Sequence, residues 1–272
     1  MIPSPFEYVS AGSADEAVEL LRRHGDDAKL LAGGHSLLPM MKVRLAAPSV
    51  LIDVGSIRSL SYVRVVDGEL AIGAATTHQT VATSPEVRSQ VPLLAWSAGL
   101  VGDPQVRHRG TIGGSLAHAD PAADLPMALS AVDGRVVVLG PSGEREIGAD
   151  EFFVGYFETA LAPDEMIVEV RMPARPGQPW GYQKFTRRAS DWAIVGVATV
   201  DGRVALANMG AAPVRAVSTE QALAAGAGAT EAAGLAAEES DPAEDMHADV
   251  AYRRHLAQVL TKRALISAGV PA

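Results

Sequence analysis

LLAGGHSLLPMMKVRLAAPSVLIDV, residues 30–54, carries a glycine pair between two apolar segments. Residues 29–32 predict a short buried strand that runs directly into Gly33-Gly34, and residues 50–54 predict a second strand. Leu37 and Leu38 predict the start of a short helix after the glycines. The pattern therefore places a glycine loop at the end of a buried strand, where a ligand can approach the backbone closely.

A second glycine pair lies in VGDPQVRHRGTIGGSLAHADPAADLP, residues 101–126, where Thr111 and Ser115 flank Gly113-Gly114. Since glycine has no Cβ, successive backbone N–H groups can point into one concavity and bind an anion. A lone glycine pair is more simply explained as a tight turn, but two such loops favour a shared diphosphate site. Neither loop has the spacing G-x-G-x-x-G or G-x-x-x-x-G-K, so Rossmann and P-loop sites are disfavoured.

The composition limits the chemistry open to this chain. A length of 272 residues with 48% hydrophobic residues predicts two packed units. The net charge of -9 disfavours nucleic acid as a partner. The sequence has no cysteine, which excludes disulfides, thiolate zinc sites, a cysteine nucleophile and Cys-held iron–sulfur clusters in this chain. With no signal peptide and no apolar stretch near the ~20 residues of a membrane span, we expect a cytoplasmic protein.

Helix and strand patterns divide the chain near residue 175. Ser13 and Glu16 have capping-box spacing ahead of a helix that ends at Gly25, and Asp67-Gly68 predicts a hairpin turn. A Pro- and Gly-rich linker follows residue 173. Other predicted elements are a helix with an acidic start at 120–132, strands at 135–139, 166–172, 182–185, 193–200 and 203–208, a capping box at Ser218 and Gln221, and a last helix at 249–267.

The two long strings resemble the flavin-binding segments of the FAD subunit of molybdenum hydroxylases, the medium subunits of the carbon monoxide dehydrogenase and xanthine dehydrogenase type. YQKFTRRASDWAIVGVA, residues 182–198, resembles the start of that family's C-terminal domain. The resemblance covers essentially the full chain and implies an α+β fold. Residues 1–175 would form a two-subdomain FAD-binding fold of the vanillyl-alcohol-oxidase (PCMH) type, divided near residue 56. Residues 176–272 would form a small domain of antiparallel sheet and helices.

The resemblance also implies the cofactor-binding residues, because the family's FAD diphosphate lies between the two glycine segments. Asp124 matches the acidic residue that holds the polar part of the flavin, and Ile167 and Lys184 match positions that line it. Ser115 and His108 depart from the family, which usually has Asn in place of Ser115 and often has Asn in place of His108. Serine has less reach than asparagine and lacks a second donor. The implied FAD-binding residues are Ala32, Gly33, Gly34, His35, Ser36, Leu37, Thr111, Gly113, Gly114, Ser115, Asp124, Ile167 and Lys184.

The histidines near these segments favour local roles. His35 is better explained as a polar loop residue than as a flavin tether, and His78 as a helix start capped by threonine. His108 and His118 either contact the cofactor or satisfy local backbone groups. No third ligand with metal-site spacing accompanies His118, so no metal site is expected.

For each of four further side chains, the sequence leaves open both a role near the cofactor and an ordinary structural role. Arg107 and Arg109 either steady the diphosphate or an electron acceptor, or are ordinary surface arginines. Trp192 either stacks on the flavin or packs under the C-terminal sheet. Asp120 either points at the flavin or complements a helix N-terminus.

The family's reaction implies an electron-transfer subunit of a molybdenum-containing hydroxylase. A large molybdopterin-binding partner would hydroxylate the substrate, and the 2Fe–2S clusters of a small partner would pass electrons to FAD in this chain for delivery to an external acceptor. The implied assembly is a dimer of heterotrimers. Because the cofactors carry the chemistry, we expect no general acid, base or nucleophile in this chain.

Two other functions stay open at this point. A self-contained FAD-dependent oxidase or reductase of the same fold would need a substrate pocket over the flavin and a larger cap domain. A cofactor-free scaffold would have degenerate loops, and the two intact glycine pairs argue against it. For the hydroxylase, the open substrates are carbon monoxide, a purine, an N-heterocycle and an aldehyde.

Overall fold

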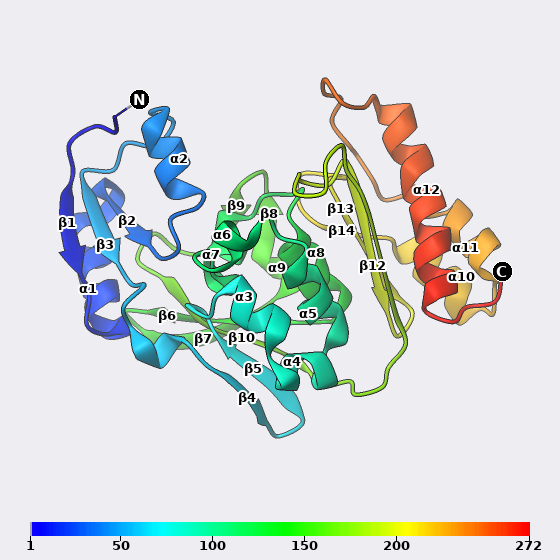
Figure 1. The fold of residues 1–272 in the computed structure, drawn as a ribbon, viewed down its shortest axis with the longest axis horizontal. Coiled ribbons are helices and arrows are strands. Elements are labelled where there is room, and N and C mark those ends of the chain that lie inside the picture. Colours follow the sequence, from blue (N-terminus) through cyan, green and yellow to red (C-terminus); the bar gives the residue numbers. More distant parts are fainter. Residues whose placement is uncertain (1) are drawn as a thin grey trace.

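The N-terminal unit is a small parallel sheet backed by one helix. The computed structural model describes residues 2–272 and places this unit at one end of the molecule (Figure 1). The strand order is β1 (Glu7–Ser10), β3 (Val50–Asp53), β2 (Ala28–Leu31), so β3 is central. Helix α1 (Ala14–His24) begins where the Ser13 side chain accepts a hydrogen bond from the Glu16 N–H and ends at Gly25 with φ 56°, which confirms the predicted cap and stop.

The middle unit is a five-stranded antiparallel sheet in the order β4-β5-β10-β6-β7, with helices packed on one face (Figure 1). The turn between β4 and β5 has φ 52° at Asp67 and 80° at Gly68, which confirms the predicted hairpin. The elements of this unit are β4 (Val63–Val66), β5 (Glu69–Gly73), α3 (His78–Thr83), α4 (Pro85–Gln90), α5 (Pro92–Gly99), α6 (Pro104–Arg107), α7 (Ile112–His118), α8 (Asp124–Ala131), β6 (Arg135–Gly140), β7 (Gly143–Gly148), α9 (Ala149–Phe152), β8 (Phe153–Gly155), β9 (Glu158–Thr159) and β10 (Met166–Pro173).

Helix α8 starts four residues later than the acidic pattern predicts. The Asp120 side chain accepts a hydrogen bond from the Ala122 N–H at 2.9 Å and so closes a turn ahead of the helix. Aspartate commonly stabilises such turns by bonding to the backbone two residues on. Asp120 and Asp124 therefore do not share one helix face.

The C-terminal unit is a four-stranded antiparallel sheet, β11 (Trp180–Phe185), β12 (Val195–Val200), β13 (Arg203–Ala207) and β14 (Val214–Arg215). The sequence predicted the first three strands and missed the two-residue β14. Helix α8 packs on one face of this sheet and α12 (Val250–Ser267) on the other (Figure 1). Helix α12 confirms the last helix predicted at 249–267, and the Asp249 side chain caps its start by accepting the Tyr252 N–H. The remaining helices are α10 (Val217–Ala224) and α11 (Ala229–Gly234).

The capping box predicted at Ser218 and Gln221 is wrong. Helix α10 already begins at Val217, and no side chain caps its Ala216 N-cap position. The Ser218 hydroxyl instead donates to the Glu239 carboxylate at 2.6 Å. The Ser218 side chain therefore binds Glu239, which is distant in the sequence, and does not cap the helix as the local pattern predicted.

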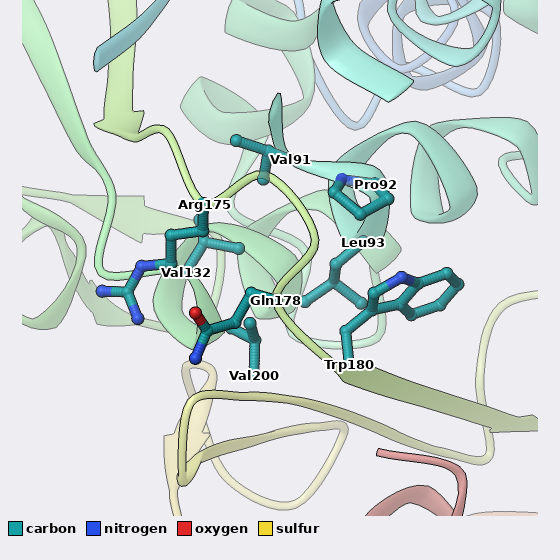
Figure 2. A pocket seen from close by; sticks show the side chains of 8 residues that line it. All are labelled: Val91, Pro92, Leu93, Val132, Arg175, Gln178, Trp180 and Val200. Carbon is teal, nitrogen blue, oxygen red and sulfur yellow. The ribbon is translucent and has the colours of Figure 1, made fainter. Parts of the chain in front are cut away.

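The linker between the middle and C-terminal units is fixed by hydrogen bonds. Arg175 and Gln178 each donate to the Asp201 carboxylate at 2.7 Å. A cavity of about 10 Å³ lies at this linker, and Figure 2 shows Arg175, Gln178 and Trp180 among the side chains that line it. Because this volume is about that of one water molecule, this cavity is too small to hold a cofactor.

Candidate functional site

The first glycine pair leaves a row of backbone donors free. Strand β2 ends at Leu31, and the first helix after the loop, α2 (Leu37–Lys42), begins six residues later. Gly34 has φ 76°, a conformation that glycine adopts without strain. Within residues 2–272, the N–H groups of Gly33, Gly34, His35 and Ser36 donate to no other group. Four successive free N–H groups are the arrangement that binds an anion without a cationic side chain.

The second glycine pair is not a loop, contrary to the sequence interpretation. Gly113 and Gly114 lie in the first turn of α7, and the Thr111 side chain accepts the Gly114 N–H at 3.1 Å as its N-cap. The Gly113 N–H donates to the Ala74 carbonyl at 2.9 Å. The N–H groups of Ile112 and Ser115 also have partners, the carbonyl oxygens of Thr76 and Thr111. This segment therefore supplies no free row of N–H donors, and the prediction of a second cradle of that kind is wrong.

The two glycine segments meet in space, as the sequence predicted. A Cβ placed on Gly33 would lie 2.2 Å from the Arg109 carbonyl oxygen and 2.7 Å from the Gly110 Cα. Any side chain at residue 33 would thus push the chain leading into α7 away from the first loop. Thr77 forms a β-bridge with Thr111, which fixes that chain from the other side. The contact places residue 33 directly against residues 109–110.

His78 lies directly behind this contact, at the start of α3. The Thr77 side chain accepts the Thr80 N–H, so the helix start is capped as predicted. The His78 side chain is buried, and burial, with smaller contributions from the charges of His35 and Arg107, lowers its pKa to about 4. The ring is therefore neutral at pH 7.

Asp124 and Lys184 contact each other across the interface between the middle and C-terminal units. Lys184 Nζ lies 2.9 Å from Asp124 Oδ2, and the Tyr182 hydroxyl donates to Oδ1. The two charged side chains are less than one-tenth exposed. Burial and the Asp124 charge hold the pKa of Tyr182 well above its ordinary value. Both Asp124 oxygens thus have protein partners, so the pair ties α8 to β11 whatever else it binds.

Sequence reasoning missed Tyr182. It lies two residues before Lys184 in β11, and side chains at i and i+2 of a strand share one face. That spacing was the available signal, but only the packing of β11 against α8 shows that the face meets Asp124.

Ile167 is a buried residue of β10, paired with Val138 of β6. The strand register shifts between Ile167 and Glu169, and the carbonyl of the intervening Val168 accepts the Ala74 N–H. The neighbouring Ala74 carbonyl accepts the Gly113 N–H. The irregular part of β10 therefore connects through residue 74 to the second glycine pair.

The structure resolves some of the remaining alternatives. Trp192 is 63% exposed, so it does not pack under the C-terminal sheet. Arg107 donates to the carbonyl oxygens of Val101 and Gly102, both at 3.1 Å, which gives it a local role. Arg109 is exposed beside Gly33. His118 packs against Phe157 with ring centroids 5.1 Å apart and the ring planes tilted by 45°.

Two other kinds of site find no support in the described chain. Residues 2–272 contain no group of three His, Asp or Glu side chains placed to hold a metal ion. None of the helices within that range has the length and apolar character needed to cross a membrane.

Comparison with protein families covers nearly all of the chain. Residues 4–175 match the FAD binding domain in molybdopterin dehydrogenase, and residues 180–268 match the CO dehydrogenase flavoprotein C-terminal domain. The chain is 43% identical to the carbon monoxide dehydrogenase medium chain of Hydrogenophaga pseudoflava, with 98% of each chain covered. It is 38% identical to the nicotine 6-hydroxylase medium subunit of Paenarthrobacter nicotinovorans, with 96% of each covered.

Solved structures agree with these relationships. The fold matches carbon monoxide dehydrogenase from Hydrogenophaga pseudoflava which lacks the Mo-pyranopterin moiety of the molybdenum cofactor, with a TM-score of 0.94, 43% identity and 99% of each chain covered. The predicted α+β architecture, an FAD-binding domain followed by a sheet-and-helix domain, is confirmed.

Proposed function

We propose a function from one premise: this chain belongs to the family of FAD-binding medium subunits of molybdenum hydroxylases. In the proposal it joins a large molybdopterin-binding subunit and a small subunit with 2Fe–2S clusters, in a dimer of heterotrimers. Bound FAD would supply the redox chemistry that links the clusters to an external electron acceptor, and this chain would hold and orient the cofactor. The domain division near residue 175 belongs to the same proposal.

The observation that carries the proposal is the row of free N–H groups at residues 33–36. A dinucleotide diphosphate is an anion, and free backbone donors bind it without the cost of desolvating a lysine or arginine. Gly33 lets the chain at Arg109 and Gly110 close over this row. The residues present therefore fit the diphosphate of FAD.

The second segment serves the cofactor differently. Because its N–H groups already have partners, we assign its cofactor contacts to the exposed face of Gly114 and the side chain of Ser115, with Thr111 and Gly113 as support. Asp124, Lys184 and Ile167 stay assigned to the flavin end. The Asp124–Lys184 pair supports that assignment by fixing both side chains at the junction of the two domains.

The absence of cysteine supports the division of labour between subunits. Biological 2Fe–2S clusters need cysteine ligands, and this sequence has none. The clusters must then belong to a partner. Relatives at 32–43% identity include medium chains of dehydrogenases for carbon monoxide and glyceraldehyde, which supports a substrate chosen by the large subunit.

Purification with co-expressed neighbours tests the proposal. We expect flavin absorption bands, 2Fe–2S absorbance and two further chains. Flavin alone with turnover of a small molecule would instead establish a self-contained oxidase. Failure to take up FAD on reconstitution would establish a scaffold.

A matched pair of variants tests the loop assignment. Gly34→Val should abolish FAD retention while the fold persists, because the first loop loses both its φ of 76° and its open donors. Gly202→Val is the control: Gly202 has φ 77° but open space around it, in the turn between β12 and β13. Equal FAD binding by the two variants, measured by flavin fluorescence titration, would refute the assignment.

A further inference from the structure

His78 has features that its place at a capped helix start does not explain. The side chain is 4% exposed, yet its Nδ1 has no hydrogen-bond partner among residues 2–272. A buried polar atom without a hydrogen-bond partner destabilises a fold. An apolar residue would avoid this loss, so the ring has some use that offsets it.

One edge of the His78 ring packs against Gly110. A Cβ placed on Gly110 would lie 2.7 Å from both Cδ2 and Nε2 of His78, closer than real Cβ atoms approach. The ring edge therefore occupies the space where a side chain at residue 110 would begin. The Gly110 carbonyl also accepts the His78 N–H at 2.9 Å, so backbone and ring hold the same residue.

Gly110 in turn supports the first glycine loop. Its Cα lies 2.7 Å from the position that a Cβ on Gly33 would take. His78, Gly110 and Gly33 are thus stacked in that order, with no side chain between the imidazole and the loop. A shift of the ring would pass through Gly110 to the free N–H groups of residues 33–36.

Burial keeps this ring uncharged at neutral pH. Two neighbouring basic side chains, His35 from the first loop and Arg107 from the end of α6, lower the pKa of His78 in the same direction as burial. A neutral imidazole can lie close behind the loop without drawing water into the contact.

We propose that His78 is a positioning residue for the FAD diphosphate, acting through Gly110 to hold the loop at residues 33–36 in its binding geometry. The proposal rests on the proposed function, since it presumes that this loop binds FAD. It adds a residue from outside the two glycine segments to the binding machinery.

A double-mutant cycle on His78 and Gly110 tests it, with the dissociation constant of FAD as the readout. His78→Ala removes the support, and Gly110→Ala drives a methyl group into the ring; each should weaken FAD binding about 10-fold or more. In the double variant the new methyl group occupies part of the space that the ring left. Its loss should be well below the product of the single losses, by about 5-fold or more.

Two measurements separate positioning from stability. Val81→Ala removes a fully buried side chain from the same helix α3 and should lower the melting temperature of the apoprotein while leaving FAD affinity within about 2-fold. His78→Asn keeps atoms in the positions of Nδ1 and Cδ2 and should lose less affinity than His78→Ala. It also keeps the test available if the alanine variant does not fold.

The outcomes distinguish this proposal from the one it rests on. A wild-type chain that takes up no FAD overturns the proposed function and this proposal with it. Wild-type binding together with unchanged affinity in folded His78→Ala or His78→Asn, or single losses that simply multiply, overturns only the role of His78.

Discussion

Gly33-Gly34 and Gly113-Gly114 look alike in the sequence, each a glycine pair with a hydroxyl residue close behind it. In the structure the first pair lies in an open loop whose N–H groups have no partner within residues 2–272. The second lies in the first turn of α7, and its N–H groups donate to Ala74 and Thr111. The N–H groups of the first pair are free to bind a ligand, whereas those of the second pair already form hydrogen bonds within the protein.

The difference shows what a glycine pair signals. Both pairs mark places where something approaches the backbone more closely than a Cβ allows. For Gly33 the approaching group is the Arg109 carbonyl, and for Gly113 it is Ala74. Only the count of satisfied donors tells a ligand loop from a packing contact, and that count needs the tertiary structure.

Gly33→Ala should have the largest effect and act on binding. The new methyl group would lie 2.2 Å from the Arg109 carbonyl oxygen, so the two segments must separate. We expect FAD affinity to fall about 100-fold or more, equivalent to ~2.7 kcal/mol, with a smaller change in apoprotein stability. Titration of the apoprotein with FAD measures the first and thermal unfolding the second. Affinity within 3-fold of wild type would show that the contact does not shape the site.

Gly113→Ala should act mainly on stability. Its methyl group would lie 2.6 Å from the Ala74 Cβ and 2.8 Å from the Ala74 carbonyl oxygen. Overpacking of this kind costs about 1–3 kcal/mol, while alanine regains about 1 kcal/mol of helix propensity, so we expect a net loss of up to about 2 kcal/mol in the free energy of unfolding. Denaturant unfolding of the apoprotein measures it. A variant with normal stability but lost FAD binding would reverse the roles we assign to the two pairs.

Ser115→Asn should have the smallest effect, and a favourable one. Asparagine has more reach and a second donor, and Ser115 lies beside the exposed Gly114. We expect FAD to bind about 2- to 5-fold more tightly, in line with one modest hydrogen bond. A fluorescence titration against wild type measures it, with Ser115→Ala as the control that should not gain. Equal changes in both variants would remove Ser115 from the set of cofactor contacts.

Local patterns predicted the elements whose ends depend on neighbouring residues. The helix from Ser13 to Gly25, the hairpin at Asp67-Gly68 and the last helix at 249–267 were all confirmed, because each rests on residues close together in the chain. The predicted cap at Ser218 failed because Glu239, distant in the sequence, binds that side chain. The strand β14 was missed because two residues carry no periodic signal.

The candidate site followed the same rule: the sequence predicted which segments belong to it, but not the contacts between residues distant in the chain. Resemblance to a family supplied both glycine segments, and the structure confirmed that they meet. It also named Asp124 and Lys184, but as separate contacts with the flavin. Their ion pair, and the part of Tyr182 in it, join residues about 60 apart in the chain, a distance over which no local pattern operates.

The sequence by itself therefore determined which residues are present: two glycine pairs, no cysteine, and the residues by which the chain resembles an FAD-binding domain followed by a smaller domain. What only the tertiary structure decided is the state of each backbone donor. The positions of the glycines in the sequence determine where another group can approach the backbone closely, because a glycine has no side chain in the way. Whether an N–H there is free depends on which carbonyl the fold brings within 3 Å, and folding alone sets that distance.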